Sequence, residues 1–239
     1  MFWPQFGHAS DCDPGTFACA FARQAIIMAW NVTNLTLAGT GTIDGNGKDW
    51  WSCSHNLTAL PCGGHGRPHL LDVFLSRNIQ MYDLNVRNSP DWTLHFSGVE
   101  SLHVRNVNVQ NPVNAPNSDG IDLDCVKSAL IENSYFDVGD DALCVKSGID
   151  YFGRLYNHPS RDIMFRNIEI GAGHGISLGS ETSGSIVNVT FENIKMYVFF
   201  TQSSHTYSLT QSIKPYTGQE HHEDHESRAN VDVVERWKK

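Results

Sequence analysis

The sequence carries little charge and contains no long apolar run. Of its 239 residues only 18% are charged, while 40% are hydrophobic. A chain with this apolar content is not disordered, and without a run of about 18 apolar residues we expect no transmembrane helix and no membrane partner. Positive charge is also in deficit, because the formal net charge is -9. This argues against nucleic acid as a partner, since proteins neutralise phosphates with Lys and Arg.

A secretory signal is missing too, although other features are typical of secreted proteins. Residues 1–10, MFWPQFGHAS, have no basic start followed by an apolar run. Six cysteines fit an oxidising compartment. Asn-X-Thr glycosylation sequons begin at Asn31, Asn34, Asn56 and Asn188. We therefore expect a secreted glycoprotein of the extracellular space or cell wall, with its signal absent from this chain.

The cysteine spacing leaves the disulfide pairing open. Cys12 and Cys19 are close enough in sequence to close a small loop, and so are Cys53 and Cys62. Six cysteines allow about 15 pairings, however, and unpaired buried thiols are the alternative.

Helical periodicity is lacking as well, and a repeat of short alternating segments takes its place. Segments that alternate apolar and polar residues, as half-buried strands do, begin at Asn34, Asn78, Ser101, Ser128, Asp162 and Asn188. The positions expected to point inward are Leu35/Leu37, Ile79/Met81, Leu102/Val104, Ala129/Ile131, Ile163/Phe165 and Val189/Phe191. The first gap, from residue 34 to residue 78, hides either an extra turn of the repeat or a long loop.

Asparagine ends four of these segments at one register, at Asn106, Asn133, Asn167 and Asn193. Asparagine tolerates the left-handed backbone that a sharp corner needs, and stacked asparagines hydrogen-bond to one another. An irregular repeat of this kind is typical of a solenoid. The alternative is a β-sandwich, whose strands recur about every 8 to 12 residues with hairpin turns, but Asn-Gly hairpin signals are scarce. The sequence therefore predicts an all-β chain, a parallel β-helix in a single domain.

Polar motifs form a second column when three segments are aligned. NSDGIDL (117–123), GDDALCV (139–145) and GAGHGISL (171–178) place Asp119, Asp141 and His174 at one position, with Asp140 beside Asp141. Adjacent coils of a β-helix lie about 4.8 Å apart, so these side chains would share one face. Three carboxylates and an imidazole there make an acid/base site. The alternative for the adjacent aspartates is a polar turn before a strand.

These motifs resemble those of the polygalacturonases, the pectin-cleaving enzymes of glycoside hydrolase family 28. The family's Asn-Thr-Asp, Gly-Asp-Asp and Gly-His-Gly motifs correspond to residues 117–119, 139–141 and 173–175, with Ser118 in place of threonine. GTIDGNGKDWW (41–51) and NSPDWTLHF (88–96) are also similar to the family, and the resemblance covers residues 26–197. It implies that the parallel β-helix is right-handed.

The resemblance further implies hydrolysis of α-1,4 links between galacturonates, with inversion at the anomeric carbon. Asp140 would be the general acid, while Asp119 and Asp141 would hold the attacking water as general base, and such a pair needs room for that water. His174 would tune the acid or bind sugar. The substrate-binding residues would be Asn117, Gly173 and Gly175. We expect a monomer that needs no metal and no cofactor and whose partner is pectin or polygalacturonate.

The C-terminal part departs from the family pattern. The family continues with a strand and an Arg-Ile-Lys motif whose two cations hold the substrate carboxylate, whereas this chain has Ser-Ile-Lys at 212–214 after no convincing strand. We expect an unassigned segment over 1–25, the catalytic β-helix over 26–197, incomplete at its C-terminal end, and a divergent, disordered tail over 198–239. A truncated or mis-spliced chain would explain this tail. Its run EHHEDHE (220–226) is expected to be solvated rather than to bind metal.

Other activities stay open. Residues 147–160 lengthen one coil beside the expected site, and a wall there would favour exo attack, with Arg154 exposed to solvent. A relative that acts on rhamnogalacturonan and a catalytically inactive pectin-binding chain are the alternatives to a polygalacturonase.

Overall fold

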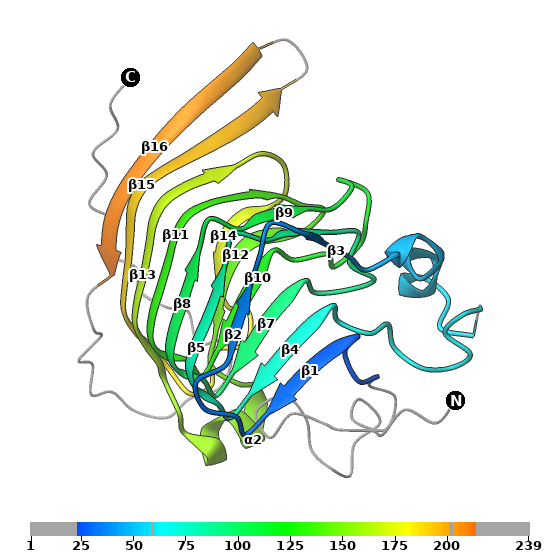
Figure 1. The fold of residues 1–239 in the computed structure, drawn as a ribbon, viewed down its shortest axis with the longest axis horizontal. Helices are drawn as coiled ribbons and strands as arrows, with labels where there is room; N and C mark the ends of the chain where they lie inside the picture. Colours follow the sequence, from blue (N-terminus) through cyan, green and yellow to red (C-terminus); the bar gives the residue numbers. More distant parts are fainter. Residues whose placement is uncertain (1–22, 59, 201–202, 214–239) are drawn as a thin grey trace, which may run out of the picture.

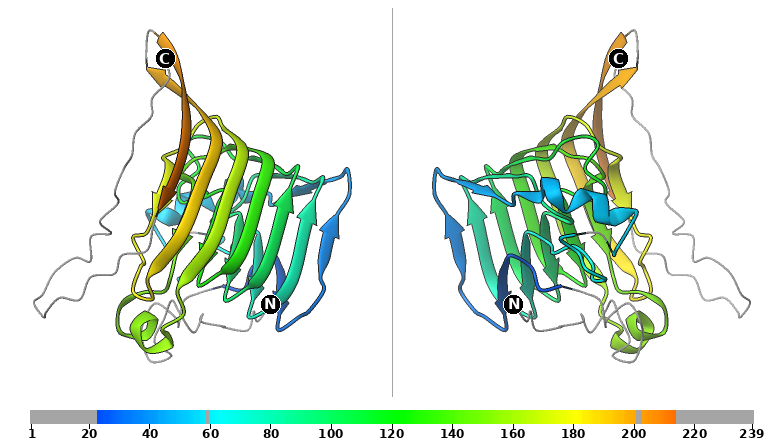
Figure 2. Two further views of the ribbon diagram at one scale, coloured as in Figure 1. Left: turned by 90° about the vertical axis from the view of Figure 1, so that its left-hand side faces the viewer. Right: turned by 90° about the vertical axis from the view of Figure 1, so that its right-hand side faces the viewer.

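The computed structural model describes residues 23–58, 60–200 and 203–213. Within them the chain winds through stacked coils that add strands in turn to two sheets (Figure 1, Figure 2). Sheet A has the order β1-β4-β7-β10-β12-β14, with parallel pairing throughout. Its strands are β1 Ile27–Trp30, β4 Leu71–Phe74, β7 Leu94–Ser97, β10 Ile121–Asp124, β12 Asp141–Lys146 and β14 Gly175–Leu178.

Sheet B has the order β16-β15-β13-β11-β8-β5-β2, and a branch of β3, β6 and β9 continues it around a corner to β11. Its strands are β2 Thr36–Ala38, β3 Thr42–Asp44, β5 Arg77–Tyr82, β6 Asn85–Arg87, β8 Glu100–Arg105, β9 Asn108–Gln110, β11 Lys127–Asp137, β13 Ser160–Ile170, β15 Ile186–Phe200 and β16 Ser203–Ile213. All of its pairs are parallel except that of β15 with β16. The predicted right-handed parallel β-helix is confirmed.

The alternation of apolar and polar residues places one side of each strand in a common core. The inward positions predicted for β5, β8, β11 and β13 are all buried, and so are those of β15. Phe165 stacks on Phe191 of the next coil, with 5.1 Å between ring centroids. Leu35 and Leu37, at the N-terminal end of the stack, are half-buried and pack against the same core. Burial of each such side chain contributes about 1.5–3 kcal/mol to the free energy of unfolding. Because these side chains pack against those of neighbouring coils, the core holds the coils together along the axis of the stack.

Asparagines turn the chain at one corner of four successive coils. The four predicted corner asparagines all have positive φ, between 51° and 54°. Asn167 Nδ2 donates to Asn133 Oδ1 at 3.0 Å, and Asn193 Nδ2 donates to Asn167 Oδ1 at 2.8 Å. Asn106 continues this ladder by donating to Asp83 at 2.9 Å. The side-chain amides at this corner are therefore hydrogen-bonded to one another along the stack.

A second ladder lies at the starts of the repeat segments, where the sequence alone did not predict corners. All six of these starting residues also have positive φ. Asn78 donates to Asn34 at 3.1 Å, and Asn188 donates to Asp162 at 2.8 Å. Serine occupies the same corner at residues 101 and 128.

Substitution of Asn167 tests the corner ladder. Asn167→Ala removes two ladder hydrogen bonds and leaves a Cβ at a φ of 53°, so we expect a loss of about 2–3 kcal/mol of unfolding free energy. Asn167→Gly removes the same bonds but tolerates this φ, and it should cost about 1 kcal/mol less. Urea unfolding measures both variants. Equal losses would show that the left-handed conformation carries no cost at this corner.

The long first gap of the repeat is a loop and not an extra coil. Thr36 of β2 pairs directly with Gln80 of β5, so one coil spans the whole interval. The intervening chain contains two 3-10 helices, η1 Gly47–Asp49 and η2 Trp51–Ser54.

The cysteines fall into three groups. A disulfide joins Cys53 to Cys62 within the long loop. Cys125 and Cys144 are buried thiols, which donate to Asp124 Oδ1 at 3.3 Å and to the Gly179 carbonyl at 3.2 Å. Cys12 and Cys19 lie outside the described residues.

The prediction that no strand follows Tyr197 is wrong. β15 continues to Phe200, and β16 returns antiparallel along it, so that Met196 pairs with Tyr207. The return strand pairs through its backbone and needs no copy of the coil repeat, which is why the repeat did not reveal it. Residues 1–22 and 214–239, with Lys214 and the run 220–226, lie outside the described residues. The division of the chain at residues 26 and 197 stays a prediction.

Helix α2, Asp150–Tyr156, occupies the loop 147–160 and was not predicted. It follows the end of β12, whereas Asp141 begins that strand, and five residue steps of strand span about 17 Å. Figure 1 shows the helix at the lower edge, where the strands of sheet A end. The expectation that this loop lies beside the site is therefore wrong, although Arg154 is exposed as predicted. No helix in the described part of the chain is long and apolar enough to cross a membrane.

Candidate active site

Asp119 and Asp141 lie at the starts of neighbouring strands of sheet A. Ile121 of β10 pairs with Leu143 of β12, which places the two aspartates side by side two residues earlier. The backbone N–H of Gly120 donates to the Asp141 carbonyl at 2.8 Å, so the pairing continues to this point. This is the alignment that the motifs predicted.

His174 joins this cluster at Asp140 and not in the predicted column with Asp141. A register shift between Asp141 and Leu143 pairs Asp141 with Gly175, which moves His174 back by one residue. The His174 backbone N–H donates to the Asp140 carbonyl at 2.8 Å. Its ring Nδ1 lies 3.0 Å from Asp140 Oδ1 and 3.8 Å from Asp141 Oδ1. The imidazole is 67% exposed, so this contact is accessible from solvent.

Asp140 is held from two sides. Besides the His174 ring, the backbone N–H of Asp141 donates to Asp140 Oδ1 at 2.9 Å. Both contacts fall on the same oxygen, and the carboxyl is only partly buried. The second oxygen of Asp140 is therefore the one suited to approach a substrate.

Glycines let the chain pack closely behind the carboxylates. A Cβ on Gly139 would lie 2.2 Å from the carbonyl oxygen of Ala115, so only glycine fits there. A Cβ on Gly173 would lie 2.5 Å from the carbonyl oxygen of Asp140, and the φ of Gly173 is +115°. These contacts bring His174 up against Asp140. The substrate-binding role expected for Gly173 and Gly175 stays a prediction.

Gly173→Ala is expected to displace His174 and Asp140 and to slow a reaction that uses this pair more than tenfold. It should also cost about 1–3 kcal/mol of unfolding free energy, because the backbone conformation excludes a side chain. Initial rates and thermal unfolding measure the two effects. Gly41→Ala is the matched control, since a Cβ there meets nothing within 4 Å. Similar behaviour of the two variants would contradict the close packing at Gly173.

Asp119 is the carboxyl most removed from water. It is 4% exposed, and its Oδ1 has no hydrogen-bond partner among the described residues. Burial raises the pKa of Asp119 to about 9, and the charges of Asp122, Asp140 and Asp141 add to the shift. Burial and the neighbouring carboxylates therefore favour the protonated form of Asp119, which is one outcome of crowding carboxylates together.

A buried ion pair beside Asp119 was missed in the sequence. Lys146 Nζ lies 3.4 Å from Asp122 Oδ1 and 3.4 Å from Glu181 Oε2. Burial lowers the pKa of Lys146, but the charge of Asp122 outweighs it and leaves the pKa raised. Burial raises the pKa of Asp122 itself. The available signal was a lysine at the end of the otherwise apolar strand DALCVK.

Asn117 points to an arginine that sequence reasoning also missed. Arg67 Nη2 donates to Asn117 Oδ1 at 2.6 Å, and Arg67 Nη1 donates to the Pro90 carbonyl at 3.0 Å. The same guanidinium lies 3.1 Å from Asp91 Oδ1. Asn117 thus ties the motif loop to the two preceding coils, and its expected substrate contact stays a prediction.

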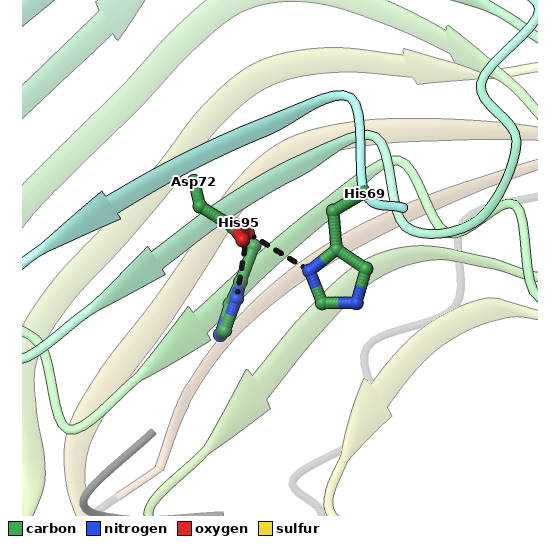
Figure 3. Close-up of side chains that lie close together, drawn as sticks. All are labelled: His69, Asp72 and His95. Atoms are coloured by element: carbon green, nitrogen blue, oxygen red, sulfur yellow. Dashed lines mark hydrogen bonds and ion pairs between the residues drawn. The ribbon is translucent and has the colours of Figure 1, made fainter. Parts of the chain in front are cut away.

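His69, Asp72 and His95 form a second polar cluster on sheet A (Figure 3). Both imidazole rings are directed at Asp72, with His69 Nδ1 2.8 Å and His95 Nδ1 3.2 Å from Asp72 Oδ1. Burial lowers the pKa of His69, but the charge of Asp72 and the hydrogen bond to it raise that pKa to about 9. The same partners hold the pKa of Asp72 below its usual range despite burial.

Within the part of the chain that the structure describes, two side-chain sets have the geometry to hold a metal ion. The ligand atoms lie within 4.8 Å of one another in the set His69, Asp72 and His95 and in the set Asp140, Asp141 and His174. In both sets a carboxylate is already paired with an imidazole. A proton between the two groups can therefore take the position that a metal ion would occupy. Both histidine–carboxylate sets therefore have a sufficient role as hydrogen-bonded pairs.

Comparison with known proteins decides the family. The model of the family described as "Glycosyl hydrolases family 28" matches residues 18–199. The chain belongs to this family. Its motif residues lie within the matched part, on the face of sheet A described above.

Relatives and solved structures agree with this assignment. A "Probable polygalacturonase" of Vitis vinifera is 33% identical over 197 residues, which are 80% of this chain and 38% of that protein. An "Endo-polygalacturonase" of Pectobacterium carotovorum is 32% identical over 180 residues, 72% of this chain and 43% of that protein. The exopolygalacturonase structure from Thermotoga maritima superposes with a TM-score of 0.65 at 28% identity, over 72% of this chain and 46% of that one. The chain thus spans less than half the length of the relatives it matches.

Proposed function

We propose that this family 28 chain is a polygalacturonase that hydrolyses α-1,4-galacturonosyl links in pectin with inversion. The observation that carries the proposal is the position of Asp140, held by the His174 ring and the Asp141 N–H beside the buried Asp119. The names of its relatives support the substrate class. We further propose that the chain acts as a monomer.

In the proposed reaction Asp140 gives its proton to the glycosidic oxygen as the bond to the anomeric carbon breaks. A water attacks that carbon from the opposite face, which inverts its configuration. Asp141 takes the proton of this water. Exchange with solvent then returns a proton to Asp140 and removes one from Asp141, so the site is restored without a covalent intermediate.

Asp119 takes a different part from the one that the motifs implied. A carboxyl with a pKa of about 9 is protonated in the mildly acidic solutions where pectin hydrolysis would be measured. A protonated Asp119 donates a hydrogen bond to the water but cannot accept its proton. The role of base therefore falls on Asp141, and Asp119 positions the water.

Secretion is part of the proposal. The disulfide between Cys53 and Cys62 supports an oxidising compartment, since such bonds are rare in the cytosol. Asn56, in one of the four sequons, lies exposed on the same loop, and its Oδ1 accepts a hydrogen bond from Thr58 Oγ1 at 2.7 Å. A glycan at Asn56 would therefore project into solvent.

The test is the product released from polygalacturonate at mildly acidic pH. New reducing ends, with the β-anomer appearing first in the proton NMR spectrum, would support hydrolysis with inversion. The α-anomer appearing first would contradict inversion. No reducing ends from a chain whose circular dichroism shows folded β structure would favour the alternative of a pectin-binding protein.

A further inference from the structure

We propose that His69, Trp92 and Lys146 form a binding site for a carboxylate of the sugar polymer, on the coils that precede the catalytic aspartates. We call these three residues the cationic face. The proposal rests on the function proposed above and adds to it the groups that hold the anionic substrate.

The cationic face is built on the outer side of sheet A. Asp72, His95, Asp122 and Cys144 are neighbours in register across β4, β7, β10 and β12. The inward neighbours of these residues fill the core, so the row itself points outward. Asp72 fixes the His69 ring, and Asp122 fixes the Lys146 ammonium. Two residues of this row, Asp72 and Asp122, therefore hold the side chains of His69 and Lys146 in place.

Trp92 links the two cations. The His69 ring stacks on Trp92, with centroids 4.8 Å apart and an angle of 20° between the planes. Lys146 Nζ lies 3.6 Å from the centroid of the Trp92 ring. A cation at an aromatic face is stabilised by the ring electrons. Trp92 thus holds both positive groups in place at little conformational cost, because its own ring packs edge-on against His95.

The cationic face lies next to the catalytic residues. Leu94 pairs with Ile121, so Trp92 stands beside Asp119 on the preceding coil, and the Thr93 N–H donates to the Asp119 carbonyl at 3.0 Å. Neighbouring coils are separated by about 4.8 Å. A polymer that crosses the strands with one sugar at Asp119 and Asp140 would therefore place the next sugar over Trp92.

The charge of this region suits an anion. His69 is 20% exposed and Lys146 8% exposed, and Figure 3 shows the second nitrogen of His69 directed away from Asp72. Burial raises the pKa of Asp91 to about 6, as it raises the pKa values of Asp119 and Asp122. In mildly acidic solution these pKa values favour the protonated forms of Asp91 and Asp119, whereas Asp122 is the ion-pair partner of Lys146.

The remaining charged groups balance one another. Besides His69 and Lys146, the surrounding elements contribute Arg67 as a cation and Asp72, Asp122 and Glu181 as anions, and His95 packs beneath Trp92. Three cations thus face three anions, and His69 is the most exposed of the cations. Each galacturonate in the polymer brings one carboxylate, which a charge-assisted hydrogen bond from the His69 ring would hold.

The experiment compares binding of an oligogalacturonate and of its methyl ester by calorimetry. An Asp140→Asn chain is the parent, so that no hydrolysis interferes. At pH 5 we expect His69→Gln in this parent to weaken binding of the acid about tenfold and binding of the ester less than twofold. Glutamine keeps a donor for Asp72 but carries no charge. His103→Gln is the matched control, because His103 also pairs with a carboxylate, Glu132 at 2.9 Å, but on sheet B.

Equal affinities of His69→Gln and its parent for the acid would overturn the inference, and so would equal affinities of the parent for acid and ester. If His69→Gln fails to fold, Asp122→Asn/Lys146→Met removes the second cation together with its buried partner and should give the same selective loss. Hydrolysis by the unmodified chain is scored separately. If the unmodified chain hydrolyses the polymer but His69→Gln does not change the affinity, the proposed function stands and this binding site is overturned. If the chain neither hydrolyses nor binds the polymer, the proposed function and the binding site are both overturned.

Discussion

An Asp140→Asn chain is expected to hydrolyse polygalacturonate about 10²–10⁴-fold more slowly than the unmodified chain, which is the usual contribution of a general acid. Asparagine keeps the shape of the side chain and can still accept the Asp141 N–H, but it has no proton to give to the leaving oxygen. The KM should change little, because the substrate contacts remain. Initial rates at saturating substrate and pH 5 measure the effect.

Asp162→Asn is the control for this substitution. Asp162 accepts the amide of Asn188 in the corner ladder, and asparagine fills equivalent corners elsewhere in the stack. Its rate should match that of the unmodified chain. If Asp140→Asn retains the full rate as well, the proton must come from another group, and Asp140 is not the acid.

Asp119→Asn is expected to stabilise the fold while it slows catalysis. The folded pKa of Asp119, about 9, lies far above the usual value of 3.8 for an aspartate, so the unfolded chain releases this proton more easily than the folded one. Its contribution to stability is complete below about pH 4 and is lost progressively as the pH rises toward 9. Asparagine does not titrate, so the variant avoids this loss. We expect its free energy of unfolding to exceed that of the unmodified chain by on the order of 2 kcal/mol at pH 8 and to equal it at pH 4.

Chemical unfolding of both chains between pH 4 and pH 9 measures this gain. Asp44→Asn supplies a control with the opposite sign, because a hydrogen bond from the Asn46 N–H lowers the pKa of Asp44. That variant should be slightly less stable than the unmodified chain above pH 4. A stability of Asp119→Asn that runs parallel to the unmodified chain across the whole range would show that Asp119 is charged in the fold.

The repeat of the fold could be predicted because each coil requires the same local pattern of residues in the sequence. Corner residues such as Asn133 need a left-handed backbone, and inward residues such as Ile131 must be apolar, so both leave a visible mark. The same holds for the pairing of Asp119 with Asp141, which follows from the apolar register of Ile121 and Leu143.

The rest depended on geometry that no local pattern encodes. The shift that brings His174 to Asp140 is a one-residue irregularity between Asp141 and Leu143, and only the paired backbone reveals it. The contact between Arg67 and Asn117 joins residues 50 apart in sequence, from separate coils. β16 pairs antiparallel and needs no coil repeat, and α2 is a short insertion after β12, so periodicity could not indicate either one.

The one-strand-per-coil pairing of sheet A has a consequence for how such a protein changes in evolution. Asp72, His95 and Asp122 are successive steps of one hydrogen-bonded stack, so distances along the axis come in multiples of about 4.8 Å. A change of one residue within a strand would turn the outward groups inward, whereas the gain or loss of a whole coil keeps every register. The number of sugars that this surface can hold is therefore expected to change in whole steps, by duplication or deletion of coils.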